Sequence, residues 1–121
     1  PRARAATLAA LATAADADPR LFARARDLDD AVARLRALPG IGEWTAQYIA
    51  MRALREPDAF PATDVGLLRA MAANGVRPTP DALAARAEAW RPWRAYAAQH
   101  LWTSDGAPVI GGRRVPEEAV A

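Results

Sequence analysis

One carboxylate in this chain stands where it could do chemistry. Asp64 follows the loop "REPDAFPAT" and opens the segment "DVGLLRAMAA", so we expect it in the first turn of a helix. Backbone N–H groups and the helix dipole at that position favour an ionised carboxylate. The position also suits ordinary helix capping, as for Asp29 and Asp81, and capping is the more frequent role of such an acid. Asp64 is therefore a candidate catalytic carboxylate with a structural alternative.

The turn "LPGIG", residues 38–42, sets two glycines two positions apart directly before a helical segment. Glycine permits left-handed backbone and a close approach that a side chain would forbid. Between antiparallel helices, the N–H groups of such a turn and of the next helix point outward and form a phosphate site. The expected donors are the amides of Gly40, Gly42, Glu43, Trp44 and Thr45. A plain helix-helix corner, in which glycine serves geometry alone, explains the turn equally well.

Aromatic side chains at helical spacing form the third candidate group. Trp44 and Tyr48 are four residues apart and lie on one face of a helix. The stretch "WRPWRAYAAQHLW", residues 90–102, adds three more tryptophans, the last of them Trp102. Such residues more often belong to a core, and we expect some of the four tryptophans there. Gathered in a cleft, aromatic faces would instead stack a nucleobase, at about 1 to 3 kcal/mol each.

Composition excludes several mechanisms. All 16 basic residues are arginine, so no lysine is present to form a Schiff base with an aldehyde or an opened sugar. Cysteine is absent, which excludes disulfides, a thiolate zinc site and an iron-sulfur cluster, and His100 alone cannot build a metal site. The net charge of +2 is weak support for a nucleic-acid partner. Without an apolar run of membrane-spanning length, we expect a cytoplasmic protein with no membrane contact.

The elements that must position these residues are helices. Alanine-rich windows such as "RAATLAALATAA" have high helix propensity and low strand propensity, and 121 residues can bury one core, so we expect an all-α fold. Asp27 caps a helix that ends at Pro39, and "EWTAQYIAMRAL" resumes the helix after the turn. Residues 28–54 are thereby predicted to form a helix-hairpin-helix.

Cap residues delimit the helices after the hairpin. Thr63 is expected to cap the helix that contains Asp64, and Asn74 with Gly75 to end it in left-handed conformation. Thr79 and Pro80 are expected to open the next helix as cap and first residue. Residues 104–121 are rich in turn formers and are predicted to be a loop or a poorly ordered tail.

Three stretches, in order and spacing, resemble one known family. "LPGIGEWTAQYIAMRAL", "PDAFPATDVGLLRA" and "AEAWRPWRAYAAQHLW" are similar to the C-terminal part of the DNA-3-methyladenine glycosylase II (AlkA-type) enzymes, within the helix-hairpin-helix DNA glycosylase superfamily. Three linked motifs are far more specific than one hairpin. The likeness covers most of residues 1–103 and implies a partial helix-hairpin-helix glycosylase-like helical bundle over that range.

The resemblance implies a role for each candidate residue. Asp64 matches the family's catalytic aspartate, and Trp44, Tyr48 and Trp102 match aromatics of its base pocket. Where lyase-active cousins carry a nucleophilic lysine, this chain has Trp44, which agrees with the absence of lysine and implies a monofunctional enzyme that uses water.

The family's hairpin also holds a monovalent cation through backbone carbonyls. By resemblance these would be the carbonyls of Arg36, Leu38 and Ile41. No other cofactor is implied.

The implied function is hydrolysis of the N-glycosidic bond of alkylated purines such as 3-methyladenine in double-stranded DNA, the first step of base excision repair. Two residues depart from the family pattern: Val65 stands where some members have an aromatic residue, and Glu43 adds negative charge near the phosphate site. The family's N-terminal β-rich domain and the first part of its helical domain have no counterpart here. We therefore expect a fragment of a longer enzyme, with weak or no activity alone.

Two other classes of function remain compatible with these features. A non-catalytic helix-hairpin-helix module would share the sequence-independent, salt-dependent DNA binding but would not need the Asp64 carboxylate. A helical protein-interaction domain would need neither DNA nor the carboxylate.

Overall fold

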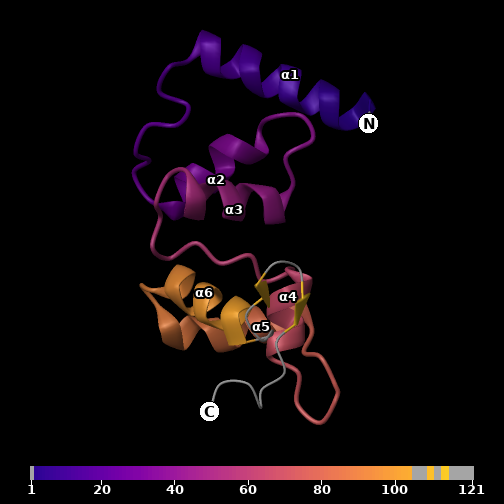
Figure 1. Ribbon diagram of the computed structural model, residues 1–121. Helices are drawn as coiled ribbons and strands as arrows, with labels where there is room; N and C mark the ends of the chain where they lie inside the picture. The colour runs from indigo at the N-terminus through magenta and orange to yellow at the C-terminus, as the bar shows by residue number, and fades with distance from the viewer. Residues whose placement is uncertain (1, 105–108, 111–112, 115–121) are drawn as a thin grey trace. The chain divides into compact units, whose positions relative to one another are not determined.

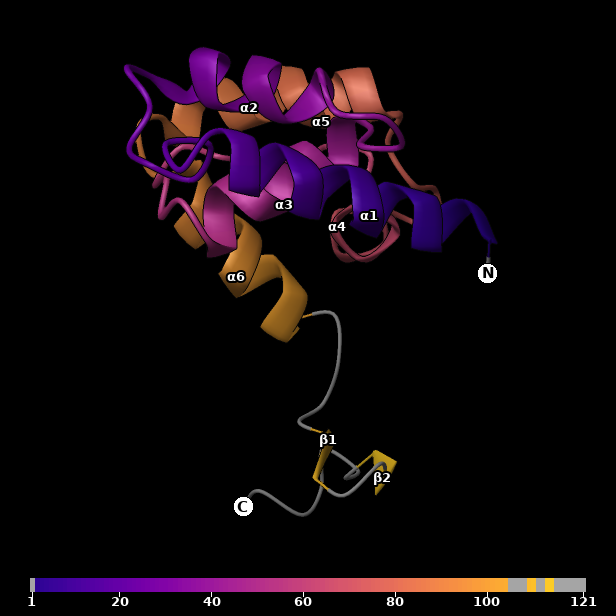
Figure 2. The ribbon, with the colours of Figure 1, turned by 90° about the horizontal axis from the view of Figure 1, so that it is seen from above.

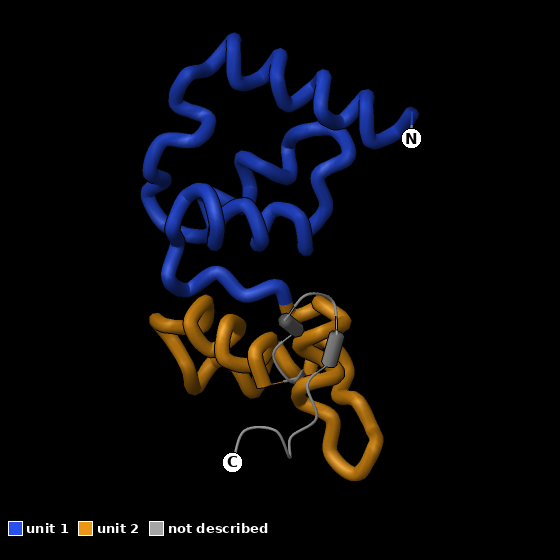
Figure 3. The backbone as a smooth tube through the Cα atoms, in the orientation of Figure 1, with its two compact units in different colours: residues 1–61 blue, residues 62–121 orange. Residues whose placement is uncertain are grey.

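The computed structural model describes residues 2–104, 109–110 and 113–114 and divides the chain into two compact units (Figures 1 and 3). Unit 1 spans Pro1–Pro61 and unit 2 spans Ala62–Ala121. Regular structure in the described residues is helical apart from two strands of two residues each, which confirms the all-α prediction. The sequence predicts one helical region over residues 1–103, and the boundary between the units falls inside it. Over the described ranges, no helix has both the length and the apolarity needed to cross a bilayer.

The described part of unit 1 consists of α1 (Arg2–Ala17), α2 (Leu28–Arg36), α3 (Glu43–Arg52) and their connections. α1 contributes no buried residue, and Leu8 on it is 65% exposed. Its alanine-rich sequence makes a helix by intrinsic propensity rather than by packing into the core.

α2 and α3 pack against each other as the predicted helix-hairpin-helix (Figure 2). The Asp27 carboxylate caps α2 by accepting the Asp30 backbone N–H at 2.8 Å, as predicted. α2 buries Ala31, Val32 and Leu35, and α3 buries Ala46, Ala50 and Met51. The small residues of α3 allow the close packing of this helix pair.

Unit 2 contains α4 (Val65–Ala70), α5 (Pro80–Ala87), the 3-10 helix η1 (Glu88–Trp90) and α6 (Arg94–Ser104). Leu67, Leu83 and Ala98 are 1% exposed or less and form its core, one from each α-helix. α4 packs against α6, which brings the start of α4 near the end of α6. Thr79 caps α5 by accepting the Ala82 N–H at 3.1 Å, with Pro80 in the first turn, as predicted.

The start of α4 corrects one prediction. Asp64, not Thr63, is the N-cap, and its side chain accepts the Leu67 backbone N–H at 3.0 Å. Aspartate is the better N-cap of the two residue types, because its carboxylate is a charged acceptor for the N–H groups of the first turn. Asp64 thus stands immediately before the helix rather than within its first turn.

The end of α4 corrects a second prediction. Asn74 and Gly75 are left-handed, with φ of 51° and 77°, but α4 ends earlier, at Ala70. They form a two-residue turn closed by backbone hydrogen bonds in both directions between Ala73 and Val76, at 3.0 and 2.9 Å. Two successive left-handed residues match the turn type that closes a hairpin. Asparagine and glycine thus predict the left-handed conformation correctly, but not that it closes a turn instead of ending α4.

The predicted tail, residues 104–121, is described only in part. Ser104 ends α6, and β1 (Val109–Ile110) pairs antiparallel with β2 (Arg113–Arg114). Residues 105–108, 111–112 and 115–121 lie outside the described residues.

The hairpin turn requires glycine at one position and tolerates a side chain at the other. Gly40 has φ of +80°, and a Cβ there would overlap the Thr7 side chain of α1, whereas a Cβ on Gly42 would meet nothing within 4 Å. Gly42 is the N-cap of α3, with φ of −89° and ψ of −179°. Only Gly40 combines left-handed backbone with a close neighbour.

Gly40→Ala is therefore expected to lower the free energy of unfolding by at least about 1 to 2 kcal/mol, because alanine is strained in left-handed backbone. Chemical denaturation followed by circular dichroism measures the loss. Gly42→Ala is the matched control and should cost about 1 kcal/mol or less, because it replaces an acceptable N-cap by a poor one without backbone strain. Equal losses for the two variants would contradict this account of the turn.

Candidate active site

One oxygen of the Asp64 carboxylate accepts hydrogen bonds from two parts of unit 2. Its Oδ1 accepts the backbone N–H of Leu67 at 3.0 Å and the indole Nε1–H of Trp102 at 2.8 Å. The first bond is the helix cap, and the second reaches across 38 positions of sequence from the end of α6 to the start of α4. Asp64 and Trp102, both predicted site residues, are thus brought together within unit 2.

Both bonds restrict the carboxylate and favour its charged form. Two N–H donors on one oxygen are better satisfied by a carboxylate than by a neutral acid, and bonds to a charged acceptor are stronger than neutral ones. Asp64 and Trp102 are half-buried, so the negative charge is partly withdrawn from water. A fixed, ionised and partly desolvated carboxylate can stabilise a nearby positive charge or orient a water molecule.

Trp44 and Tyr48 form an aromatic wall on α3. Their rings are stacked, with centroids 5.0 Å apart and an interplanar angle of 10°. The guanidinium of Arg52, one turn further along the helix, lies 5.5 Å from the Tyr48 ring centroid. Because the two rings cover each other, a planar ligand would stack against an outer face of the pair rather than enter between them.

The tryptophans correct a further prediction, that some belong to the core. Trp44 is 39% exposed, Trp93 is 58% exposed, and Trp90 and Trp102 are half-buried. Leucine and alanine fill the core of unit 2 instead. The core interpretation of Trp44 is accordingly wrong, because its side chain lies at the surface of unit 1.

The predicted backbone donors lie in the hairpin turn and in the first turn of α3. The Ile41 N–H bonds to the Leu38 carbonyl at 3.2 Å and closes the turn, and Gly42 offers no side chain to cap α3. The first amides of α3, from Glu43 to Thr45, therefore receive no side-chain cap from the N-cap residue. This is the arrangement in which a helix start can accept an anion.

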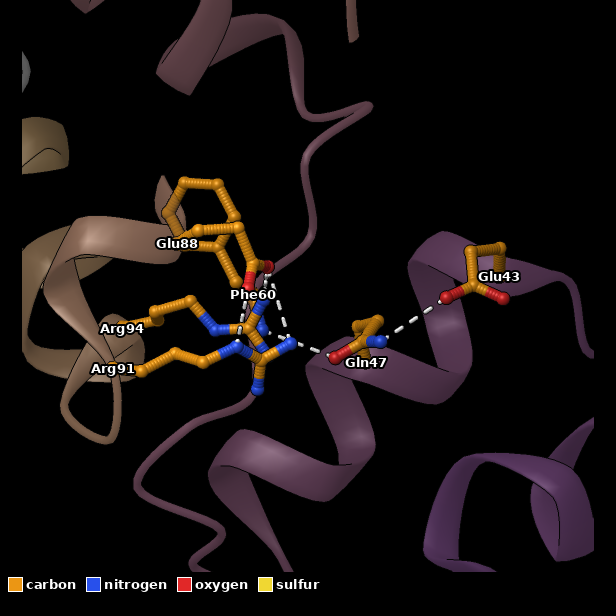
Figure 4. A network of polar contacts seen from close by, with 6 residues as sticks. All are labelled: Glu43, Gln47, Phe60, Glu88, Arg91 and Arg94. Carbon is orange, nitrogen blue, oxygen red and sulfur yellow. Dashed lines mark hydrogen bonds and ion pairs between the residues drawn. The ribbon is translucent and has the colours of Figure 1, made fainter. Parts of the chain in front are cut away.

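Glu43, whose charge stands near these amides, is held by neighbours in unit 1. Its Oε2 pairs with Arg36 Nη1 at 2.9 Å, and its Oε1 accepts from Gln47 Nε2 at 3.1 Å. Gln47 Oε1 in turn accepts the Phe60 backbone N–H at 3.0 Å (Figure 4). Arg36 offsets the negative charge that the sequence places beside the turn.

A second polar cluster lies within unit 2. The Glu88 carboxylate pairs with Arg91 at 2.7 and 3.1 Å and with Arg94 Nη1 at 3.3 Å (Figure 4). Arg94 is 9% exposed at the start of α6, so this pairing satisfies a buried charge and ties η1 to α6.

The predicted cation ligands are backbone carbonyls of the hairpin. Leu38 already accepts the Ile41 N–H and retains a second lone pair on the same oxygen. Arg36 ends α2, and Ile41 lies in the turn with its side chain buried. Carbonyl oxygens are ligands for hard cations, and in the described part of the chain no cluster of acidic or histidine side chains could hold a metal.

Three features of the site were not predicted from sequence. The bond from Trp102 to Asp64 needs tertiary packing to be seen. The contact of Arg52 with Tyr48 could have been found from their four-residue spacing, and the pairing of Arg36 with Glu43 from their positions on either side of a short turn.

No protein-family model matches the chain. It is 47% identical over its whole length to a probable bifunctional transcriptional activator/DNA repair enzyme AlkA of Mycobacterium tuberculosis, and covers 24% of that protein. It is 36% identical over 80 residues to DNA-3-methyladenine glycosylase 2 of Escherichia coli and 41% identical over 76 residues to a DNA-3-methyladenine glycosylase of Bacillus subtilis. These matches cover 66% and 60% of this chain, and 27% and 25% of the relatives.

The chain thus spans about a quarter of the length of the curated relatives it matches. The helix-hairpin-helix, the Asp64 carboxylate and the aromatic residues all fall within a stretch that is similar along its whole length to the mycobacterial protein. The chain is a homologue of the AlkA-type DNA-3-methyladenine glycosylases and corresponds to their C-terminal portion.

Proposed function

We propose that this chain carries the catalytic carboxylate of a monofunctional DNA glycosylase of base excision repair. The reaction is hydrolysis of the N-glycosidic bond of alkylated purines, such as 3-methyladenine, in double-stranded DNA. The observation that carries the proposal is the Asp64 carboxylate, which two N–H donors hold in place in a chain homologous to DNA-3-methyladenine glycosylases. Because the chain spans about a quarter of its relatives, activity is expected from a longer parent protein and only weakly from this part alone.

Asp64 acts on the sugar rather than on the base. A purine alkylated at a ring nitrogen is positively charged and leaves without protonation, so the barrier lies in the positive charge that develops on the sugar. A fixed carboxylate stabilises that charge and orients or deprotonates the attacking water. This chain holds no lysine that could attack the sugar as a Schiff-base nucleophile beside Asp64.

By resemblance to the family's base pocket, Trp44, Tyr48 and Trp102 are the residues expected to stack on the flipped base. Extrusion of a nucleotide from the duplex costs a few kcal/mol, less for a damaged pair, and stacking on aromatic faces offsets much of it. A cationic base gains additional cation-π attraction on these rings. The stacked Trp44 and Tyr48 rings would act together as one wall, with Trp44 as the more exposed face.

The hairpin binds the DNA backbone without reading its sequence. The amides of Gly40, Gly42, Glu43, Trp44 and Thr45 would donate to a phosphate group. The pairing of Arg36 with Glu43 reduces the repulsion that the carboxylate would exert there. A monovalent cation bound by the carbonyls of Arg36, Leu38 and Ile41 would brace the turn and add positive charge next to the phosphate. Action on chromosomal DNA would place the parent protein in the bacterial cytoplasm.

Asp64→Asn tests the catalytic role. Asparagine can still accept both hydrogen bonds at Oδ1 and is an equally good helix cap, so the fold should persist while the charge is lost. Release of 3-methyladenine from methylated duplex DNA, measured by chromatography in the parent protein, is expected to fall by at least about 10²-fold.

Asp81→Asn is the matched control, since Asp81 is an exposed acid in the first turn of α5. This control should release base at the rate of the unaltered protein. Base release that survives Asp64→Asn would leave Asp64 as a helix cap and would favour the non-catalytic DNA-binding module.

Trp44→Ala tests the aromatic wall. The variant keeps its backbone amide for the phosphate and loses only the ring, so affinity for a duplex containing hydrolysis-resistant 3-deaza-3-methyladenine should fall by about 5- to 150-fold. Fluorescence anisotropy measures the binding, with an unmodified duplex as the reference. Trp93→Ala removes an equally large exposed ring directly before α6 and should leave the affinity unchanged. The same loss in both variants would contradict a specific stacking role for Trp44.

A further inference from the structure

Gly66 is a glycine inside a helix whose backbone does not require one. It lies in α4 with no positive φ, unlike Gly40 and Gly75. Glycine at such a position weakens a helix relative to alanine. Gly66 therefore lowers the stability of α4. Its missing side chain is expected to leave room for a contact between other residues.

That contact is the bond between Trp102 and Asp64. A Cβ on Gly66 would lie 3.0 Å from Asp64 Oδ1, 3.1 Å from Trp102 Cδ1 and 3.3 Å from Trp102 Nε1. These three atoms include the donor and the acceptor of the 2.8 Å hydrogen bond. The edge of the indole therefore approaches the carboxylate at the place that a Cβ of residue 66 would occupy.

We propose that Gly66 is a positioning residue, whose missing side chain admits the indole edge of Trp102 and so fixes the orientation of the Asp64 carboxylate. A methyl group at this position makes contacts tighter than ordinary van der Waals distances with both partners, and each of them must give by a few tenths of an ångström. The Leu67 N–H anchors Asp64 from within α4. Displacement of the indole edge and of the carboxylate away from this methyl group changes the geometry of the 2.8 Å bond.

The proposal assigns Trp102 a second role beside that of a base-stacking wall. Its N–H orients the carboxylate, and the surface that its ring offers a base depends on the space at Gly66. The relevance to catalysis rests on the proposed function, but the geometry itself can be tested without DNA.

The test follows the indole N–H of Trp102 by ¹H–¹⁵N NMR in the whole chain. The resonance is identified among those of the four tryptophans by its loss in Trp102→Phe. In the unaltered protein it should move with pH as Asp64 titrates, and Asp64→Asn should abolish that movement. Gly66→Ala should shift the resonance toward that of an indole without a charged acceptor and remove most of its pH response.

Val65→Ile is the matched control, because it adds one methyl group at the neighbouring position, which is 58% exposed. This variant should leave the Trp102 resonance and its pH response unchanged. An unchanged resonance in Gly66→Ala as well would overturn the proposal.

Stability measurements provide a second, independent readout. With Trp102 present, Gly66→Ala should not strengthen folding, whereas in a Trp102→Ala background it should raise the folding equilibrium constant by about two- to fivefold, the ordinary gain of alanine over glycine in a helix. If Gly66→Ala alone unfolds while the double variant folds, the proposal is supported. If alanine stabilises both backgrounds equally, or unfolds both, Gly66 does not act through the indole and the proposal is wrong.

Base release by the parent protein is measured in parallel. If the unaltered parent releases no base, the proposed function fails while the NMR result still decides the role of Gly66. If base is released and Gly66→Ala reduces kcat more than KM, the positioning role extends to catalysis.

Discussion

The candidate site in unit 2 is built around a single carboxylate oxygen that two parts of the chain share. Asp64 Oδ1 accepts one N–H from the first turn of α4 and another from the indole of Trp102 on α6. The first bond is local and would form in almost any helix that begins with aspartate. The second can form only when α4 and α6 pack so closely that a side chain at position 66 would intrude. Close packing of α4 and α6 around this oxygen accounts for Asp64 as the cap, for glycine at position 66 and for the position of the Trp102 indole.

A residue that serves as a helix cap can also serve as a catalytic group, because a carboxylate held by cap hydrogen bonds is fixed in orientation and can still carry its charge. The sequence presents these roles of Asp64 as alternatives, whereas the geometry makes them compatible. The hairpin presents a similar case, since Gly40 meets a steric need of the turn while the following helix start exposes backbone donors. At Asp64 and at the hairpin turn, the groups that the fold requires are therefore the same groups to which we assign a function.

Sequence predicts those features whose causes are local. The caps at Asp27 and Thr79, the hairpin of α2 and α3 and the left-handed pair Asn74–Gly75 follow from residue types within a few positions. The choice of Asp64 over Thr63 as a cap was missed, because two adjacent residues compete and only the path of the backbone decides between them. The exposure of the tryptophans and the bond to Trp102 were also missed, since they depend on which side chains fill the core and on packing between helices distant in sequence. The face shared by Trp44 and Tyr48 was predictable from their spacing, but their stacking on each other depends on rotamers.

The most direct test of the account asks whether Asp64 recognises positive charge at the sugar. The affinity of the parent protein is measured for a duplex carrying a cationic pyrrolidine abasic analogue and for one carrying the neutral tetrahydrofuran analogue, with Asp64 and with asparagine in its place. Asp64 should confer a preference for the cationic analogue of at least about 10²-fold, and asparagine should abolish it. An equal preference in the two proteins would contradict a catalytic role for this carboxylate.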